Sequence, residues 1–176
     1  MNLAFQLLSL PLVHLYATAL EWAGHRYLFH GLGKKKGSIF GFHYAEHHRD
    51  VRRQQGLDAA YRSSPLGWHA HGRECIGIVL LGLIHLPLAF AAPLPYAYLM
   101  WRGFEYHRLH RKSHVDVAWT QQHLPWHWDH HMGPDADANW CVTCEWFDKL
   151  MGTRKPWSKR TSSVPPALIE GKSPSP

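Results

Sequence analysis

The residues best suited to chemistry are four histidines within nine positions, residues 123–131. If this segment is helical after Pro125, then His127, His130 and His131 share one face, because residues three and four apart are neighbours on a helix surface. Neutral imidazole suits zinc, iron, copper and nickel. The spacing therefore predicts a transition-metal site. The alternative, for this segment taken alone, is a protonatable surface patch.

Three more histidine clusters precede this segment and make chance a poor explanation. They are His25-x4-His30, His43-x3-His47-His48 and His107-x2-His110-x3-His114. On a straight helix the five-residue spacing of His25 and His30 separates their side chains by about 140°. The two rings therefore reach one site only across a helix bend or helix end, or else they bind different metals. His43 and His47 are four apart and are predicted to share a face.

The number of histidines indicates more than one ion. The candidate ligands are His25, His30, His43, His47, His48, His110, His114, His127, His130 and His131. A structural zinc takes four protein ligands and a catalytic zinc three, so this set fits two metals with open positions. A nitrogen-rich site suits oxygen-activating iron, whereas a zinc hydrolase more often includes a carboxylate.

Other ionisable residues near these clusters have secondary roles in this interpretation. Extra ligands, or acceptors that orient the imidazoles through hydrogen bonds, are expected among His107, His123, Glu21, Glu46 and Asp129. No catalytic residue is expected apart from the metal ligands. His14 and His85 lie inside apolar runs and are predicted to be hydrogen-bonded helix residues.

The charge distribution indicates a membrane protein. The chain of 176 residues allows one domain and carries a net charge of +6. None of its nineteen lysines and arginines falls within the apolar residues 3–20 or 75–100. This is typical of a membrane protein whose basic segments lie on the cytoplasmic side. No nucleic-acid recognition motif accompanies the charge, so no nucleic-acid partner is expected. The three cysteines are interpreted as reduced thiols.

The elements that must position the histidines are long apolar helices. Residues 3–22 predict a membrane-spanning helix of about 20 residues. A signal peptide is the alternative, but no positive charge precedes the apolar run. Residues 75–92 and 96–114 predict two helices separated by a break at Pro93-Leu94-Pro95. At about 1.5 Å per residue, each arm covers roughly the thickness of a hydrocarbon core, so the hairpin returns near the face that it left.

The expected fold is therefore all-α. We expect an integral membrane helical bundle with a histidine-rich cytosolic cap over residues 1–156, and a disordered C-terminal tail over residues 157–176. All the histidine clusters and the C-terminus are expected on the cytoplasmic side. The loop at residues 133–139 is predicted from its glycine, proline and aspartate content.

Four ordered motifs and a closing signature suggest a family. The motifs are Glu21-Trp-x2-His25-Arg-Tyr-x2-His30, His43-x3-His47-His48, Glu105-Tyr106-x3-His110-x3-His114 and His127-x2-His130-His131, with the signature at residues 139–153. In these features, which span most of the chain, the protein resembles the fatty acid hydroxylase and sterol desaturase superfamily of membrane di-iron enzymes.

The resemblance implies a cytosol-facing centre of two iron ions held by the ten histidines, with zinc as an alternative occupant of purified protein. It implies O2-dependent hydroxylation or desaturation of a lipid C–H bond in lipid biosynthesis. Electrons would come from a separate cytochrome or ferredoxin with its reductase. Two alternatives stay open: an enzyme like the bacterial carotenoid hydroxylases, and a non-catalytic membrane protein that binds or transports transition metals.

Overall fold

The computed structural model describes residues 2–157, and within them the chain forms helices and no strands. The all-α prediction is confirmed for this part of the chain. Of the predicted C-terminal tail, only Trp157 falls within the described residues.

The first predicted helix is present as α1, Leu3–Ala23. It begins at Asn2, whose side chain accepts a hydrogen bond from the backbone N–H of Phe5 and so satisfies one of the free donors of the first turn. The helix runs without interruption into a π-helical segment, η1, Gly24–Leu32. Together, residues 3–32 form the one helix in the described chain that is long and apolar enough, by length and composition, to cross a membrane.

The predicted helical hairpin is also present. It comprises α3 (Ala70–Ile84), the short α4 (Leu86–Ala91) and α5 (Pro93–Val115). The break predicted at residues 93–95 lies instead at Ala92, because Pro93 occupies the first turn of α5, where its missing N–H would have no helical partner. The helix predicted over residues 75–92 is also interrupted, at His85. The backbone N–H of Leu94 donates to the Gln6 side chain at 3.0 Å, which ties the hairpin turn to the start of α1.

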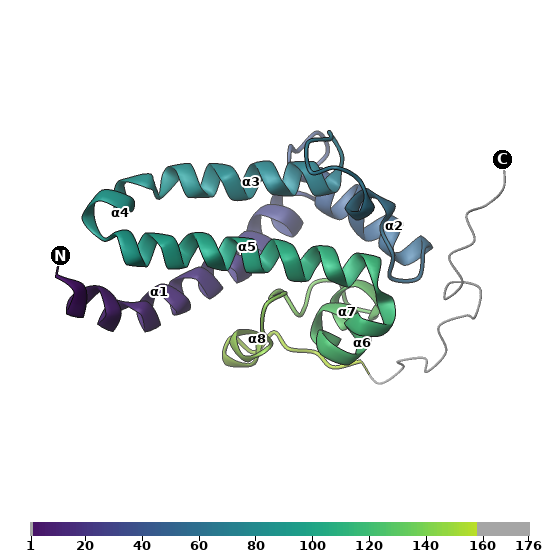
Figure 1. The fold of residues 1–176 in the computed structure, drawn as a ribbon. Coiled ribbons are helices and arrows are strands. Elements are labelled where there is room, and N and C mark those ends of the chain that lie inside the picture. Colours follow the sequence, from purple (N-terminus) through teal and green to yellow (C-terminus); the bar gives the residue numbers. More distant parts are fainter. Residues whose placement is uncertain (1, 158–176) are drawn as a thin grey trace.

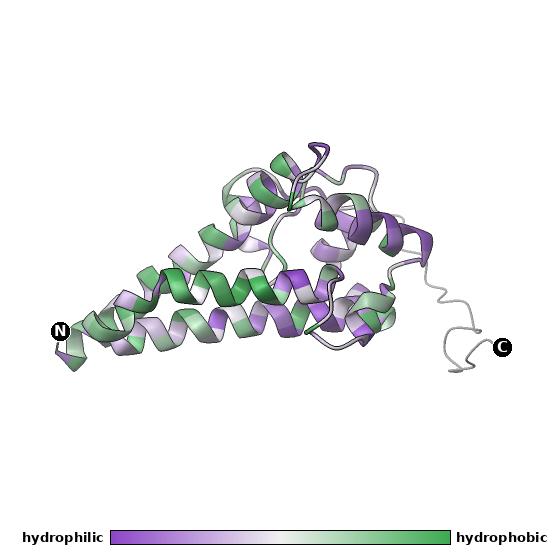
Figure 2. Cartoon of the chain, turned by 90° about the horizontal axis from the view of Figure 1, so that it is seen from above, coloured by the Kyte–Doolittle hydropathy of each residue, from purple (hydrophilic) through white to green (hydrophobic). Residues whose placement is uncertain are grey.

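The three long helices lie side by side and share one apolar end (Figure 1), where the N-terminus and the α3–α4–α5 turn are found. Apolar residues concentrate on this half of the molecule (Figure 2). Exposed large apolar side chains include Leu3, Phe5, Leu8, Leu12, Val79, Leu80, Leu83, Ile84, Phe90 and Phe104. Such a contiguous apolar surface marks a region that contacts lipid or another protein.

Most of the short helices gather at the opposite end of the long ones, and α8 lies closer to their middle (Figure 1). They are η2 (Phe42–His47), α2 (His48–Arg53), η3 (Ala59–Arg62), α6 (Val117–His123), α7 (Pro125–Met132) and α8 (Trp146–Leu150). The predicted loop at residues 133–139 is non-helical. A small core of Trp22, Trp140, Cys141 and Phe147 fixes the closing segment against the end of α1. The ten candidate ligand histidines lie at this end.

Candidate metal centre

The π-helix η1 places His25 and His30 on a common face. In a π-helix each N–H bonds to the carbonyl five residues earlier, and the Gly33 N–H bonds to the Leu28 carbonyl at 2.9 Å. Residues five apart therefore lie above one another, and the separation of about 140° expected on a straight α-helix does not arise. The two ring centroids are 5.1 Å apart.

A second π-helix, η2, has the same effect on the next motif. His43 lies in η2 and His48 follows it directly, so these two residues, five apart, point to the same place. The rings of His43 and His47, which the spacing predicts on one face, are 5.1 Å apart between centroids, and those of His43 and His48 are 5.0 Å apart. His47 contributes to a neighbouring cluster of rings.

Nine of the ten candidate histidines form two buried clusters, and the tenth adjoins one of them. The first group contains His25, His30, His43, His48 and His130; one ring nitrogen of each lies within 4.8 Å of those of the others. The second group contains His47, His110, His114 and His131 by the same measure. We include His127 in the second group, since its Nε2 lies 3.1 Å from that of His114 and its ring centroid lies 4.6 Å from that of His131. All ten residues are at most 4% exposed.

The two groups adjoin each other. The adjacent residues His47 and His48 belong to different groups, as do His130 and His131. The rings of His48 and His131 are 4.2 Å apart between centroids, and those of His130 and His131 are 5.0 Å apart. The arrangement provides two neighbouring nitrogen-lined sites rather than one large one.

Hydrogen bonds from outside fix the direction of the rings in the first group. Nδ1 of His25 lies 2.5 Å from the Trp140 carbonyl oxygen, and Nδ1 of His130 lies 2.7 Å from that of Ala138. A carbonyl oxygen only accepts, so each Nδ1 carries the proton and donates it. In a neutral ring Nε2 is then a bare lone pair, and it points into the group.

Acceptors outside the second group, two of them carboxylates, also fix the direction of its rings. Nδ1 of His47 lies 2.7 Å from Asp58 Oδ2, and Nδ1 of His110 lies 2.5 Å from Glu74 Oε2. The Gly56 carbonyl accepts from Nδ1 of His114 at 3.3 Å. Outer acceptors of this kind set the tautomer of metal-binding histidines and raise their basicity.

The inward nitrogens lack the partners that burial requires. Nε2 of His47 and of His110, and both ring nitrogens of His131, are buried without a hydrogen-bond partner in the described part of the chain. Each such group costs about 1–3 kcal/mol. His48 Nε2 lies 3.0 Å from Nε2 of both His30 and His130, and one proton on it could satisfy only one of them. A cation in each group would satisfy these lone pairs together.

The spacing of the nitrogens fits metal ligands. Two nitrogens bound at about 2.1 Å and at right angles to one ion lie about 3.0 Å apart. The four close Nε2 pairs are 2.9 to 3.1 Å apart: His25 with His43, His30 with His48, His48 with His130, and His114 with His127. The two groups of nitrogens could therefore hold metal ions.

For five of these histidines, lowered pKa values favour the protonation state that binds metal. Burial lowers the pKa of His48, His130 and His131 well below its usual value, and repulsion from neighbouring imidazolium rings lowers it further. The same causes, burial first, lower the pKa of His47 and His127. At neutral pH these rings are uncharged, and the neutral imidazole is the form that coordinates a metal.

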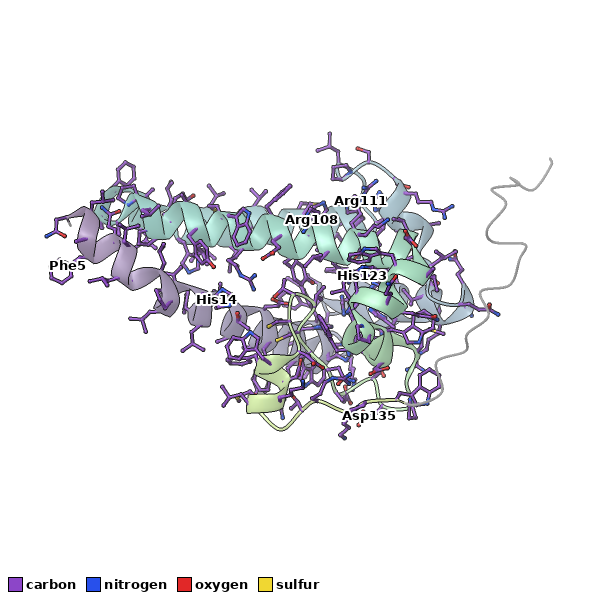
Figure 3. The ribbon with its side chains drawn as sticks, turned by 60° about the horizontal axis from the view of Figure 1, so that its bottom comes forward. Phe5, His14, Arg108, Arg111, His123 and Asp135 are labelled. Atoms are coloured by element: carbon purple, nitrogen blue, oxygen red, sulfur yellow. The ribbon has the colours of Figure 1, made fainter. Side chains whose placement is uncertain are left out.

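Several residues expected as extra ligands or orienting acceptors make contacts outside the two groups. His123 is exposed and its Nδ1 donates to the Trp119 carbonyl on α6 (Figure 3). His107 lies apart from both groups, beside His71 and Cys75. Glu46 forms an ion pair with Arg73, and Asp129 forms one with Arg154 at 2.9 Å.

Glu21 does not hydrogen-bond a histidine in the described part of the chain; it hydrogen-bonds the segment that does. Its Oε1 accepts from the backbone N–H of Val142 at 2.5 Å and of Thr143 at 2.8 Å, and its Oε2 accepts from the Thr143 hydroxyl. This holds in place the segment whose Trp140 carbonyl accepts from His25. Glu21 thus positions an acceptor rather than a histidine.

Three acidic residues that hydrogen-bond histidines were not predicted from the sequence: Asp58, Glu74 and Asp137. Asp137 Oδ1 lies 3.2 Å from Nδ1 of His30 and 107 residues away in sequence, so only the folded chain shows the contact. For Glu74 a signal was present, because it is the one acidic residue between positions 59 and 104 and it immediately precedes the second apolar run.

Asp58→Asn tests the orienting role of the outer acceptors. The amide would keep an oxygen for the backbone N–H of Ala60, which Asp58 Oδ1 now accepts at 2.8 Å, and would turn an NH2 group toward His47 Nδ1. We expect metal affinity to fall by about 10–100-fold, measured by competition with a chelator. Asp50→Asn, which removes an exposed ion pair with Arg49, is the matched control. Equal affinity in the two variants would contradict the assignment.

In comparisons with known proteins, no family model, no curated protein and no solved structure matches the chain. The assignment of function therefore depends on the site and on the motifs themselves.

Proposed function

We propose that this protein is a membrane-bound di-iron oxidoreductase of the fatty acid hydroxylase and sterol desaturase type. It would hydroxylate or desaturate a lipid C–H bond with O2 and electrons from a separate redox protein. The observation that carries the proposal is the convergence of ten buried imidazoles into two adjoining groups, with unpartnered nitrogens directed inward.

The chemistry of the donor set supports iron. Both groups consist of imidazole nitrogens, and the carboxylates Asp58 and Glu74 contact the far side of the rings instead of entering the groups. Nitrogen-rich sites with open positions are suited to oxygen-activating iron. When bound, the metal pair would supply the activation of dioxygen, and the protein would supply orientation and a site screened from water.

The place of the groups in the fold supports a lipid substrate. They lie at one end of α1, α3 and α5, and these helices carry exposed apolar side chains such as Leu8 and Val79. A bundle inserted in a bilayer by these helices would hold the metal pair at the membrane surface. A lipid could then reach it without leaving the membrane.

The distribution of charge supports a cytoplasmic position for the histidine end. Arg108 and Arg111 are exposed on α5 near that end (Figure 3), and Lys34, Lys35 and Arg49 lie in neighbouring segments. Clustered lysines and arginines beside apolar spans favour the cytoplasmic face. An external cytochrome or ferredoxin would meet the protein there.

The most informative test is lipid mass spectrometry of aerobically grown cells with and without the gene. We expect one lipid class to gain the mass of one oxygen atom in expressing cells if the reaction is hydroxylation, and to lose two hydrogens if it is desaturation. The change should vanish in the His127→Ala variant and under anaerobic growth. Unchanged lipids together with altered cellular metal content would instead favour a metal-binding or transport protein.

A further inference from the structure

We propose that the protein has a third metal site, separate from the two histidine groups, formed by His71, Cys75 and His107. One ligand atom of each residue lies within 4.8 Å of those of the other two. His71 and Cys75 are four apart on α3 and so share a face, and His107 lies on α5. The rings of His71 and His107 are parallel, with centroids 5.1 Å apart.

His71 provides an unpartnered buried nitrogen. The residue is 1% exposed, and its Nδ1 donates to the Ser63 carbonyl at 3.2 Å. The proton is therefore on Nδ1 and Nε2 is a lone pair. This Nε2 is buried without a hydrogen-bond partner in the described part of the chain. A bound cation would satisfy it.

Cys75 and Glu74 determine which cations the site would bind. The Cys75 sulfur lies 3.7 Å from His107 Nδ1, and Glu74 Oε1 lies 3.5 Å from the same nitrogen. The carboxylate therefore places a negative charge beside the two imidazoles and the thiol. One sulfur and two nitrogen ligands suit a borderline cation such as Zn²⁺ or Co²⁺, and not Mg²⁺ or Ca²⁺, which prefer oxygen.

The third site differs from the histidine groups in access. Cys75 and His107 are partly exposed, whereas the ten histidines are buried. An ion at the third site should therefore exchange more readily. Binding requires the thiolate, so the Cys75 proton would be released to solvent as the metal–sulfur bond forms. Glu74 also holds His110 through its other oxygen, which links the third site to the second group by a single carboxylate.

The test is titration of the full-length protein in detergent with Co²⁺. We expect a thiolate-to-cobalt charge-transfer absorption, and one bound ion more per chain in the wild type than in Cys75→Ala. The band should disappear in Cys75→Ala and remain in Cys144→Ala, a matched control because Cys144 is also a partly buried free thiol. Absence of the band in the wild type, or its persistence in Cys75→Ala, would overturn the proposal.

A second measurement needs no variant. Alkylation of Cys75, followed by mass spectrometry, should slow by at least about tenfold when Zn²⁺ is added, because a metal-bound thiolate is no longer free to react, and should recover with a chelator. An alkylation rate unaffected by Zn²⁺ would count against the site. Neither measurement involves iron or lipid oxidation, so the outcome is independent of the proposed function.

Discussion

Replacement of His48 by alanine is expected to abolish lipid oxidation and to lower bound iron from two ions per chain to about one or fewer. His48 Nε2 lies 3.0 Å from Nε2 of both His30 and His130, so its ring is central to the first group. Loss of even an outer hydrogen bond costs about 10–100-fold in metal affinity or activity, and loss of a ligand should exceed that. Iron content by elemental analysis and product formation by mass spectrometry are the measurements.

The matched control is His123→Ala. His123 is also a histidine at the same end of the fold, but it is exposed and its ring stacks on Trp119 outside both groups. Iron content and turnover should stay at the wild-type values. If His48→Ala retains full activity and two ions while remaining folded, the assignment of the first group as a metal site fails.

Removal of metal is expected to destabilise the protein strongly. Without a cation, nitrogens of His47, His110 and His131 stay buried and unpartnered. An ion present at 100 times its Kd stabilises the folded state by about 2.7 kcal/mol, so two ions contribute roughly 5 kcal/mol. For a chain of this size that corresponds to a fall in Tm of about 10–20 °C on chelation. Thermal unfolding in detergent, with and without a strong chelator, measures the difference.

Readdition of iron should restore the original Tm, which distinguishes metal loss from irreversible damage. The double variant His48→Ala, His131→Ala, with one ligand missing from each group, should unfold at about the same temperature with and without chelator. A wild-type Tm that does not respond to chelation would show that the buried rings are satisfied without metal.

The long helices could be predicted because they depend on local sequence. Apolar runs and helical spacing are periodic signals, and the structure has α1, α3 and α5 nearly where those signals lie. The ten candidate histidines also come together as expected.

How the histidines divide between the two groups could not be predicted from spacing alone. The division depends on the π-helices η1 and η2, and a π-helix is too rare to be assumed from sequence. An α-helical interpretation pairs His43 with His47, whereas the five-residue hydrogen bonding of η2 pairs His43 with His48.

The hydrogen bonds that orient the rings could not be predicted from the sequence either, for a different reason. They join residues distant in sequence, such as His25 with Trp140 and His110 with Glu74, and they form only when the helices pack. Proximity in sequence suggested Glu46 and Asp129, and these carboxylates form ion pairs with Arg73 and Arg154.

Anomalous X-ray diffraction at the iron absorption edge, from crystals of the iron-loaded protein, tests the central claim most directly. The account predicts two iron peaks, one among His25, His30, His43, His48 and His130, and one among His47, His110, His114, His127 and His131. A single peak, or iron bound away from these rings, would contradict it.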